Sequence, residues 1–455
     1  MLDRLRGLPA KAAAHLRLLR DDPERFGRNV LQYTNPARFE AGLIDILDQP
    51  PLHVRVEAGH PPALNILQPI LSPASMTGGP NTIVLLAALA AEAGVPVRIV
   101  TNRAGHRTDP AWFASHVSSL LGRPPPPGLR VDTGSEPASP AAVGQDDLWL
   151  ATHWTTAQGI RPVLPRMRRG WYLYLVQDFE PGFYAWSSNY ALALETYGLP
   201  HRAMINEAFL AEHLRVQGPG LYGDPAFLDR DCVVFEPAVD RRVFHPPAPG
   251  ARPGPRRLLF YARPTNARNM LGLGLQALRD ALAAGVFAGA WEFVSIGGRG
   301  SLPDIALGGG HVLRPAPWAS YAGYADSLRE ADILLCPMLS PHTSYPVLEM
   351  AACGGVVVTN TLGPKTGAAL SDLSADILGV APTVQGFVDG LAEAVRRVAA
   401  GGVRQDRLAL GTDWDRVLQP VAAWAAAAVR EDLFGSMADG HPFLQNRASS
   451  SPEGA

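Results

Sequence analysis

Short apolar stretches alternate with amphipathic ones along the chain, which is the pattern of strands and helices in turn. Apolar runs predict buried strands at residues 64–71, 97–101, 129–132, 148–152, 171–180 and 232–235. Helical periodicity predicts helices between them at residues 83–93, 112–121 and 189–197. Strands that alternate with helices are typical of a parallel sheet covered on both faces. We therefore predict a Rossmann-like domain over residues 64–240.

The same pattern restarts after a proline-rich segment, HPPAPGARPGP at residues 245–255, which is typical of an interdomain linker. Strands are predicted at residues 258–262, 293–296, 333–335, 356–358 and 377–380, and helices at residues 270–284, 321–330 and 384–399. This predicts a second Rossmann-like domain over residues 241–411. The expected fold class is α/β, with two doubly wound domains facing a central cleft.

The two ends of the chain have other patterns. Residues 1–63 are predicted to be a helical leader, and residues 437–455 form a polar, serine-rich tail that we expect to be disordered. Thr412 or Asp413 caps a helix that starts at Trp414, in a crossover segment over residues 412–436. We expect this helix to pack back across the first domain.

Net charge and the lengths of apolar runs exclude some classes of function. The formal net charge is −2, so no global field attracts nucleic acid. No apolar run reaches membrane-spanning length and the first residues lack the apolar core of a signal peptide, so a cytoplasmic location is expected. The basic amphipathic helix at the start packs on its own domain or lies peripherally at the inner face of the membrane, and both alternatives stay open.

The segment at residues 339–360, LSPHTSYPVLEMAACGGVVVTN, carries the strongest candidate chemistry. A polar loop enters a helix near Ser344, and Cys353-Gly354-Gly355 ends that helix before an apolar strand. The start of a helix offers unpaired N–H groups and the positive end of a dipole to a phosphate. Glu349, about one turn inside, either reaches a ribose hydroxyl or only complements the helix dipole.

Two loops could complete a phosphate site. Arg263 and Arg268 follow the first strand of the second domain, where they either clamp a diphosphate or are structural arginines. Gly78 and Gly79 stand between the first strand and the first helix of the first domain, where they either let backbone approach a ligand or form an ordinary turn.

Polar groups also follow strands of the first domain. Asp178 and Glu180 end the strand at residues 171–180, and we favour Asp178 in the cleft because Pro181-Gly182 turns the chain away after it. His153 ends another strand, where it contacts a sugar hydroxyl or a phosphate, or is a satisfied structural residue. Two Asp-x-Asp triplets, at residues 229–231 and 413–415, lead into a strand and cap a helix, so we predict no metal site.

Four stretches together resemble a known family. These are SPASMTGGPNT (72–82), VQDFEPGFYAWSSNYALALETYG (176–198), FYARPTNARN (260–269) and SPHTSYPVLEMAACGGVVVTN (340–360). They resemble retaining glycosyltransferases of the GT-B fold, family 4, and most of all the WsaF-type rhamnosyltransferases. The resemblance extends from Leu64 to about Leu433.

The resemblance implies transfer of L-rhamnose from dTDP-β-L-rhamnose, a nucleoside diphosphate sugar, onto a glycan acceptor, without a metal or other cofactor. It implies that Arg263 and Arg268 bind the diphosphate and that Glu349 holds the donor ribose. Gly78 and Gly79 then lie beside the phosphates and His153 contacts the donor. Asp178 would orient the acceptor.

One position departs from the family pattern. A second glutamate usually stands eight residues before the ribose carboxylate, and here this position is Pro341. We therefore also count His342, Ser344 and Tyr345 as donor-binding candidates. The alternatives are a transferase that uses another nucleotide hexose, a nucleotide-sugar epimerase, and a glycan-binding or scaffold protein without turnover.

Overall fold

The computed structural model describes residues 19–20, 50–76, 78–248, 250, 254–264, 266–298, 303–317, 319–401 and 404–431. The chain divides into two units, Met1–Pro50 and Pro51–Ala455, and nearly all described residues belong to the second. Most of the predicted helical leader and the whole predicted tail lie outside the described residues.

The first domain is built on a seven-stranded parallel sheet in the order β4-β3-β2-β6-β7-β8-β9. The strands are β2 (Leu64–Leu67), β3 (Val97–Thr101), β4 (Leu129–Thr133), β6 (Leu148–Ala151), β7 (Tyr172–Val176), β8 (His201–Asn206) and β9 (Cys232–Phe235). The helices are α4 (Gly78–Glu92), α5 (Pro110–Leu121), α6 (Trp154–Ile160), α7 (Ser188–Thr196), α8 (Ala208–Gln217) and α9 (Pro225–Asp231). Three 3₁₀ helices, η2 (Leu164–Arg166), η3 (Glu180–Phe183) and η4 (Gly220–Gly223), complete it.

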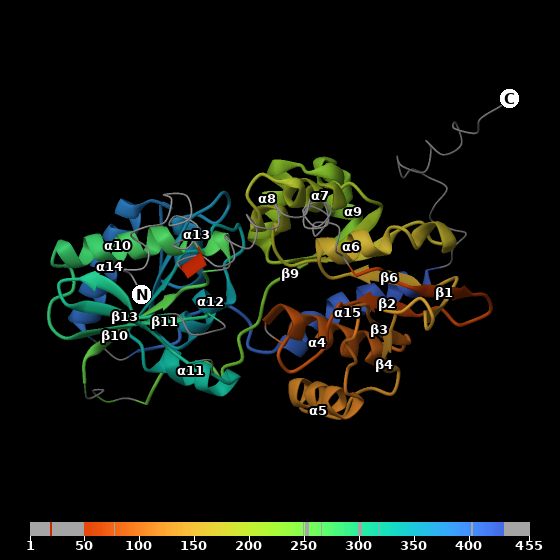
Figure 1. The fold of residues 1–455 in the computed structure, drawn as a ribbon, viewed down its shortest axis with the longest axis horizontal. Coiled ribbons are helices and arrows are strands. Elements are labelled where there is room, and N and C mark those ends of the chain that lie inside the picture. The colour runs from red at the N-terminus through yellow and green to blue at the C-terminus, as the bar shows by residue number, and fades with distance from the viewer. Residues whose placement is uncertain are drawn as a thin grey trace, which may run out of the picture. The chain divides into compact units, whose positions relative to one another are not determined.

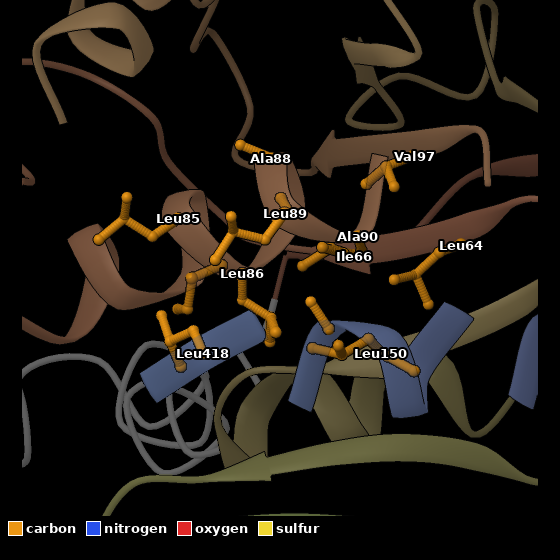
Figure 2. Packing of buried hydrophobic residues seen from close by; sticks show 14 of the residues in the cluster. Leu64, Ile66, Leu85, Leu86, Ala88, Leu89, Ala90, Val97, Leu150 and Leu418 are labelled. Atoms are coloured by element: carbon orange, nitrogen blue, oxygen red, sulfur yellow. The ribbon is translucent and has the colours of Figure 1, made fainter. Parts of the chain in front are cut away.

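Alternation along the strands builds two cores, one on each face of this sheet. Leu64, Ile66 and Leu150 pack under α4, as Figure 2 shows, together with Leu85, Leu86 and Leu89 of that helix and Leu418 of the C-terminal helix. The intervening residues Leu67, Trp149 and Ala151 face the other core, with the side chains of α6 and α8. Strands buried on both faces explain why the sequence shows continuous apolar runs here.

The C-terminal helix α15 (Trp414–Arg430) returns to the first domain, as expected from the sequence. It packs along α4 (Figure 1). Leu418, Val421 and Ala425 of α15 lie in the core of that domain. Arg169, buried beside β7, donates to the carbonyl oxygens of Ala428 and, at 2.7 Å, of Val429. These carbonyls have no partner within the helix, so a cation from the first domain caps its carboxyl end.

The second domain contains a seven-stranded sheet in the order β12-β13-β11-β10-β14-β15-β16, in which only β12 runs antiparallel. The strands are β10 (Arg256–Tyr261), β11 (Trp291–Ile296), β12 (Ile305–Gly308), β13 (His311–Pro315), β14 (Ile333–Cys336), β15 (Val356–Asn360) and β16 (Ile377–Val380). The helices are α10 (Leu271–Ala283), α11 (Tyr321–Arg329), α12 (Tyr345–Ala352), α13 (Gly367–Leu373) and α14 (Val384–Ala400), with the 3₁₀ helix η5 (Ala267–Asn269).

The faces of the second sheet are also filled by alternate residues. Leu258, Ile333 and Val356 pack with α10 and α14, whereas Leu259 and Leu334 pack with α11 and α12. The predicted arrangement of two doubly wound α/β domains is therefore confirmed.

One local prediction was wrong. Residues 54–57, which fall inside the predicted helical leader, form strand β1 (Val54–Glu57), paired in parallel with β5 (Ala141–Gly144). Other elements had no predicted counterpart, namely β5, α6, β8, α8, α9, β12, β13 and α13. Strand β8 reads HRAMIN, in which charged and polar residues interrupt the apolar signal, although the strand itself is almost fully buried.

Candidate active site

The loops after β2 and β6 lie where the strand order of the first sheet changes direction. From β2 the chain builds outward through β3 and β4, and then returns to place β6 on the other side of β2. Open α/β sheets bind ligands at such a switch point, beyond the carboxyl ends of the strands. Gly78 and Gly79 follow β2 and His153 follows β6. All three predicted residues therefore lie where this topology places a ligand.

Gly78 and Gly79 form the first turn of α4, so this helix starts five residues earlier than predicted. A Cβ on Gly78 would lie 2.9 Å from Cδ2 of Tyr345, the first residue of α12, and one on Gly79 would lie 3.4 Å from Oε1 of Gln177. A side chain at Gly78 would displace the Tyr345 ring, so glycine lets the starts of α4 and α12 approach each other. Each helix start is the positive end of a helix dipole, so two such ends meet here.

His153 is the N-cap of α6. Its Nδ1 accepts a hydrogen bond from the backbone N–H of Thr155 at 3.3 Å, so the neutral ring carries its proton on Nε2. The ring stacks on Phe183 with 5.9 Å between the centroids. Burial, reinforced by the charge of Arg268, lowers the pKa of His153 to about 4. At neutral pH His153 is thus an uncharged hydrogen-bond donor.

Asp178 and Glu180 separate after β7. Glu180 turns into the domain, where its Oε2 accepts from the backbone N–H of Trp154 at 2.5 Å and from Oη of Tyr174 at 2.9 Å. Burial raises the pKa of Glu180 to about 8. Asp178 instead faces the second domain, where Arg268 donates to it. Oδ1 of Asp178 also accepts from the backbone N–H of Phe179 at 2.8 Å. Asp178, and not Glu180, is the carboxylate that meets the other candidates, as the sequence favoured.

The second sheet has its own switch point between β10 and β14, which are neighbours in the sheet although three strands separate them along the chain. Arg263 stands two residues after β10, and Arg268 lies in η5 on the same loop. The loop after β14 holds residues 337–344 and leads into α12. The predicted donor-binding groups of this domain thus come from adjacent loops at one edge of the sheet.

Arg268 joins the two domains. Its Nη1 donates to Oδ2 of Asp178, whose Oδ1 accepts from Oγ of Ser340. The Arg268 guanidinium also lies over the ring of Phe183, with 4.0 Å between Cζ and the ring centroid. A carboxylate and an aromatic face of the first domain therefore fix the side chain that was predicted to bind diphosphate.

Arg263 and Glu349 share a neighbour. Burial raises the pKa of Tyr261, and the charges of Arg263 and Glu349 act on this phenol in opposite senses. Glu349 Oε2 accepts a hydrogen bond from Oη of Tyr324 at 2.9 Å. Burial raises the pKa of Glu349 to about 7, so this carboxyl is poised between its two forms at neutral pH.

His342 and Ser344 form the turn that starts α12. His342 Nδ1 accepts from the N–H of Ser344 at 2.9 Å, which leaves the proton of the neutral ring on Nε2, 3.2 Å from Oε2 of Glu207. Ser344 has φ of 84°, in the left-handed region that side chains rarely adopt. The ring of His342 therefore faces a carboxylate of the first domain, and its predicted contact with the donor sugar would require that pair to separate.

Glu207 and Asn206 are site residues that the sequence analysis missed. Asn206 is the last residue of β8 and Glu207 directly follows it, at the same edge of the sheet as Asp178. Both carboxylate oxygens of Glu207 lie within 3.1 Å of the backbone nitrogen of Thr343, and Oε1 also accepts from its hydroxyl. Asn206 Nδ2 donates to Oη of Tyr345 at 2.8 Å. These contacts tie the loop before α12 to the first domain, and the only sequence signal was their place after a weakly apolar strand.

Lys365 supports the same loop from within the second domain. The sequence contains only two lysines, Lys11 and Lys365, and the latter is 0% exposed. Its Nζ donates to the carbonyl oxygens of Met338 at 3.1 Å and His342 at 3.3 Å. Burial lowers the pKa of Lys365 to about 8, although Glu207 and Asp178 favour its charged form. A rare lysine in an arginine-rich chain was a signal that could have been followed.

Several buried polar atoms at this edge have no hydrogen-bond partner. They include Oε1 of Gln177, Oδ1 of Asn206 and Nε of Arg268. Leaving such groups unpaired costs free energy, so they are natural contacts for a polar ligand. Two helix starts, two arginines and an internal carboxyl match the groups of a nucleoside diphosphate: anionic oxygens and a ribose diol.

Family models match both halves of the chain. Residues 63–207 match the N-terminal domain of WsaF, and residues 256–392 match its C-terminal domain. Both Rossmann-like domains are WsaF domains. Every predicted site residue falls inside these two WsaF matches.

Individual proteins resemble this WsaF-type chain over most of its length. Over 317 residues, 67% of the chain, it is 36% identical to the O-antigen biosynthesis protein RfbC of Myxococcus xanthus, and it spans 22% of the length of that relative. The structure of HepE from Anabaena in complex with UDP-glucose covers 82% of the chain and 98% of its own, with 12% identity and a TM-score of 0.50. The GT-B fold is thereby confirmed.

Two further observations concern metals and membranes. Within the described part of the chain, no group of three or more His, Cys, Asp or Glu side chains is placed to hold a metal ion. Asp413 of the second Asp-x-Asp triplet accepts from the N–H of Asp415 at 2.9 Å and caps α15, as predicted. None of the described helices combines the length and apolar character needed to cross a membrane.

Proposed function

We propose that this chain is a retaining glycosyltransferase that moves a sugar from a nucleoside diphosphate donor onto a glycan in polysaccharide or O-antigen synthesis. One observation carries the proposal. The starts of α4 and α12 meet at Gly78 and Tyr345, and Arg268 lies at the same edge, held by Asp178. Two positive helix ends and a guanidinium at one place favour a multiply charged anion.

The donor would lie mainly on the second domain. Arg263 and Arg268 would bind the diphosphate, and the helix starts would add the positive ends of their dipoles. Glu349, one turn inside α12, would accept hydrogen bonds from the ribose. Ser344 and Tyr345 lie where the sugar joins the diphosphate, and His342 would join them once its pairing with Glu207 is exchanged.

The chemistry follows from where charge develops. As the bond between the anomeric carbon and the phosphate oxygen breaks, negative charge builds on the diphosphate, and the arginines and helix ends stabilise it. The acceptor oxygen forms its bond to the anomeric carbon on the face that the diphosphate leaves, so the configuration is retained, and the departing diphosphate takes the proton of that hydroxyl. Asp178 would orient that hydroxyl, and neutral His153 would donate a hydrogen bond through Nε2. We propose transfer without a metal because these groups supply the positive charge themselves.

The sugar we propose is L-rhamnose, donated by dTDP-β-L-rhamnose. The matches to both WsaF domains and the identity with an O-antigen biosynthesis protein support this choice. HepE was solved with UDP-glucose, so another nucleotide hexose on the same fold is the second candidate. A cytoplasmic location belongs to the same proposal, and peripheral membrane contact through the basic N-terminal helix falls on residues outside the described ones.

The test is calorimetric titration of the purified protein with dTDP, UDP and GDP, first without and then with magnesium. We expect dTDP to bind alone among the three and equally well in both conditions. Preference for UDP or GDP would replace the sugar and keep the transferase. Binding of none of them would leave a glycan-binding or scaffold protein without turnover, and binding only with magnesium would refute the metal-independent mechanism.

A further inference from the structure

Trp186 is the most exposed large hydrophobic side chain among the described residues, with 94% of its surface accessible. Tryptophan side chains in folded proteins are on average highly buried, because the indole carries a large apolar surface. An indole held almost entirely in solvent therefore needs a reason other than folding. Its position relative to the candidate active site supplies one.

The segment that carries Trp186 is fixed at both ends. On one side, Tyr184 Oη accepts a hydrogen bond from Nε1 of Trp154 at 3.0 Å, and the two rings meet edge to face. On the other side, Ser187 caps α7 by accepting from the N–H of Tyr190 at 3.3 Å. Trp186 thus projects from a short segment with two anchored ends, which reduces the entropy lost when a ligand packs on it.

The chain directly before Tyr184 also borders the candidate active site. Phe183, directly before Tyr184, stacks on His153 and lies under the guanidinium of Arg268. Three residues of fully extended chain span at most about 11 Å, so the Cα of Trp186 lies within that distance of the Cα of Phe183. A molecule that reacts near Arg268 and extends away from it over a few sugar units can therefore reach Trp186.

The charge around Trp186 selects among partners. From Pro181 to Leu194 the chain contains no Asp, Glu, Lys or Arg. Membrane surfaces and nucleic acids are bound by segments rich in Lys and Arg, and this segment has none. A neutral pyranose combines a ring of hydroxyl groups with a face of C–H groups, and that face packs on an indole with loss of apolar surface to water.

We propose that Trp186 is a stacking platform for a sugar ring of the acceptor glycan, one or more units away from the hydroxyl that reacts. The proposal rests on the proposed glycosyltransferase function and adds to it a binding subsite on the first domain. The acceptor then runs from Asp178 past Phe183 to Trp186, and its length is read outside the catalytic centre. Trp186 touches the bound acceptor and takes no part in bond making.

Fluorescence titration tests the platform directly. The probes are methyl α-glycosides of L-rhamnose, D-mannose, D-glucose and D-galactose, and the corresponding α-linked disaccharides. We expect at least one disaccharide to change the emission of the wild-type protein and to bind at least tenfold more tightly than its methyl glycoside. Trp186→Phe should lack the emission change but retain most of the binding measured by calorimetry, whereas Trp186→Ala should lose at least tenfold in affinity. No response from the wild type to any probe would overturn the proposal.

Two controls keep this result separate from the proposed function. Val216→Ala removes another exposed apolar side chain, 59% accessible, from α8, and should leave sugar binding unchanged. Titration with dTDP should give the same affinity for wild type and Trp186→Ala. If the wild type does not bind dTDP, the transferase is refuted and the platform is not. If only Trp186→Ala fails to bind dTDP, the substitution disturbs the donor site and the platform is overturned.

A membrane role is the competing result. Vesicles of phosphatidylglycerol and phosphatidylcholine should sediment the same fraction of wild type and Trp186→Ala. If the substitution abolishes sedimentation with vesicles and leaves sugar binding intact, Trp186 is a membrane contact and the glycan platform is wrong.

Discussion

The carboxyl edges of the two sheets have the same topology and opposite chemistry. The edge of the first sheet contributes the carboxylates Asp178 and Glu207 and a neutral His153. The edge of the second contributes the cations Arg268 and Lys365. The topology explains only why each edge holds polar loops, since a switch point opens a crevice in either sheet. Which sign of charge each edge presents is a matter of individual residues.

The opposite charges of the two edges are paired in this structure. Asp178 holds Arg268, and Glu207 accepts from the loop before α12, where an anionic ligand would otherwise find N–H groups. Carboxylates of the first domain thus contact groups of the second domain that we propose bind the diphosphate. Donor binding would then be an exchange of one anion for another.

The largest effect should come from removing Arg268, which pairs with Asp178 and which we propose binds the diphosphate. Arg268→Ala should lower the rate of transfer from dTDP-rhamnose by roughly 10²- to 10³-fold, because one donor aimed at a developing anion is worth about 2.7 to 4 kcal/mol. Steady-state kinetics with donor and acceptor varied separately would measure it. The loss should lie in kcat as well as in KM.

Arg242→Ala is the matched control, because the Arg242 side chain is 86% exposed and pairs with Asp240 outside the site. It should keep the wild-type rate. A wild-type rate in Arg268→Ala would contradict the diphosphate assignment. A fall in thermal stability that Asp178→Asn reverses in the double variant would trace part of the effect to the stranded carboxylate of Asp178.

Nucleotide affinity should depend mainly on groups of the second domain. Arg263→Ala and Glu349→Ala should each weaken dTDP binding by roughly 1.5 to 3 kcal/mol, since each removes a hydrogen-bond partner that is charged. That is about 10- to 150-fold in Kd, measured by calorimetry. Unchanged affinity in both variants would mean that the donor site has been placed wrongly.

Removing the carboxylate of Asp178, which would compete with the diphosphate for Arg268, should strengthen dTDP binding instead of weakening it. Asp178→Asn should tighten dTDP binding by about tenfold, because an ion-paired hydrogen bond worth roughly 1.5 kcal/mol no longer has to be exchanged. Transfer should nevertheless slow, since the acceptor hydroxyl loses its charged partner. Weaker dTDP binding in Asp178→Asn would show instead that Asp178 supports the donor site and would remove the idea of exchange.

The smallest effect should be a pH dependence set by Glu349. Burial raises the pKa of Glu349 to about 7, so the carboxylate that we propose accepts from the ribose is lost as pH falls from 8 to 6. Affinity for dTDP should therefore rise with pH across this window by less than about tenfold, one pKa unit being equivalent to about 1.4 kcal/mol.

Glu349→Gln removes that titration and is the control for it. The terminal phosphate of dTDP titrates at a pKa of about 6 as well, so the readout is the difference between the two proteins. Parallel pH profiles for wild type and Glu349→Gln would show that Glu349 does not contribute to the dependence.

The long-range partners of the predicted residues did not follow from the sequence. Arg268, Glu349 and Asp178 became candidates because each follows a strongly apolar strand or lies near the start of a helix, and the chain pattern predicts these places. Glu207 follows β8, whose mixed sequence HRAMIN hides a strand that is buried by its neighbours in the sheet. Burial of β8 depends on tertiary packing, so its carboxyl end could not be assigned beforehand.

The sequence by itself determined two α/β domains, the order of most strands along the chain, and the loops that carry the candidate site, because these depend on local periodicity and on turn residues. Only the tertiary structure decided which strands are neighbours, that α4 and α12 start against each other at Gly78, and that Asp178 holds Arg268 across the domains. Those contacts join residues that are far apart along the chain, and no local pattern contains the distance between them.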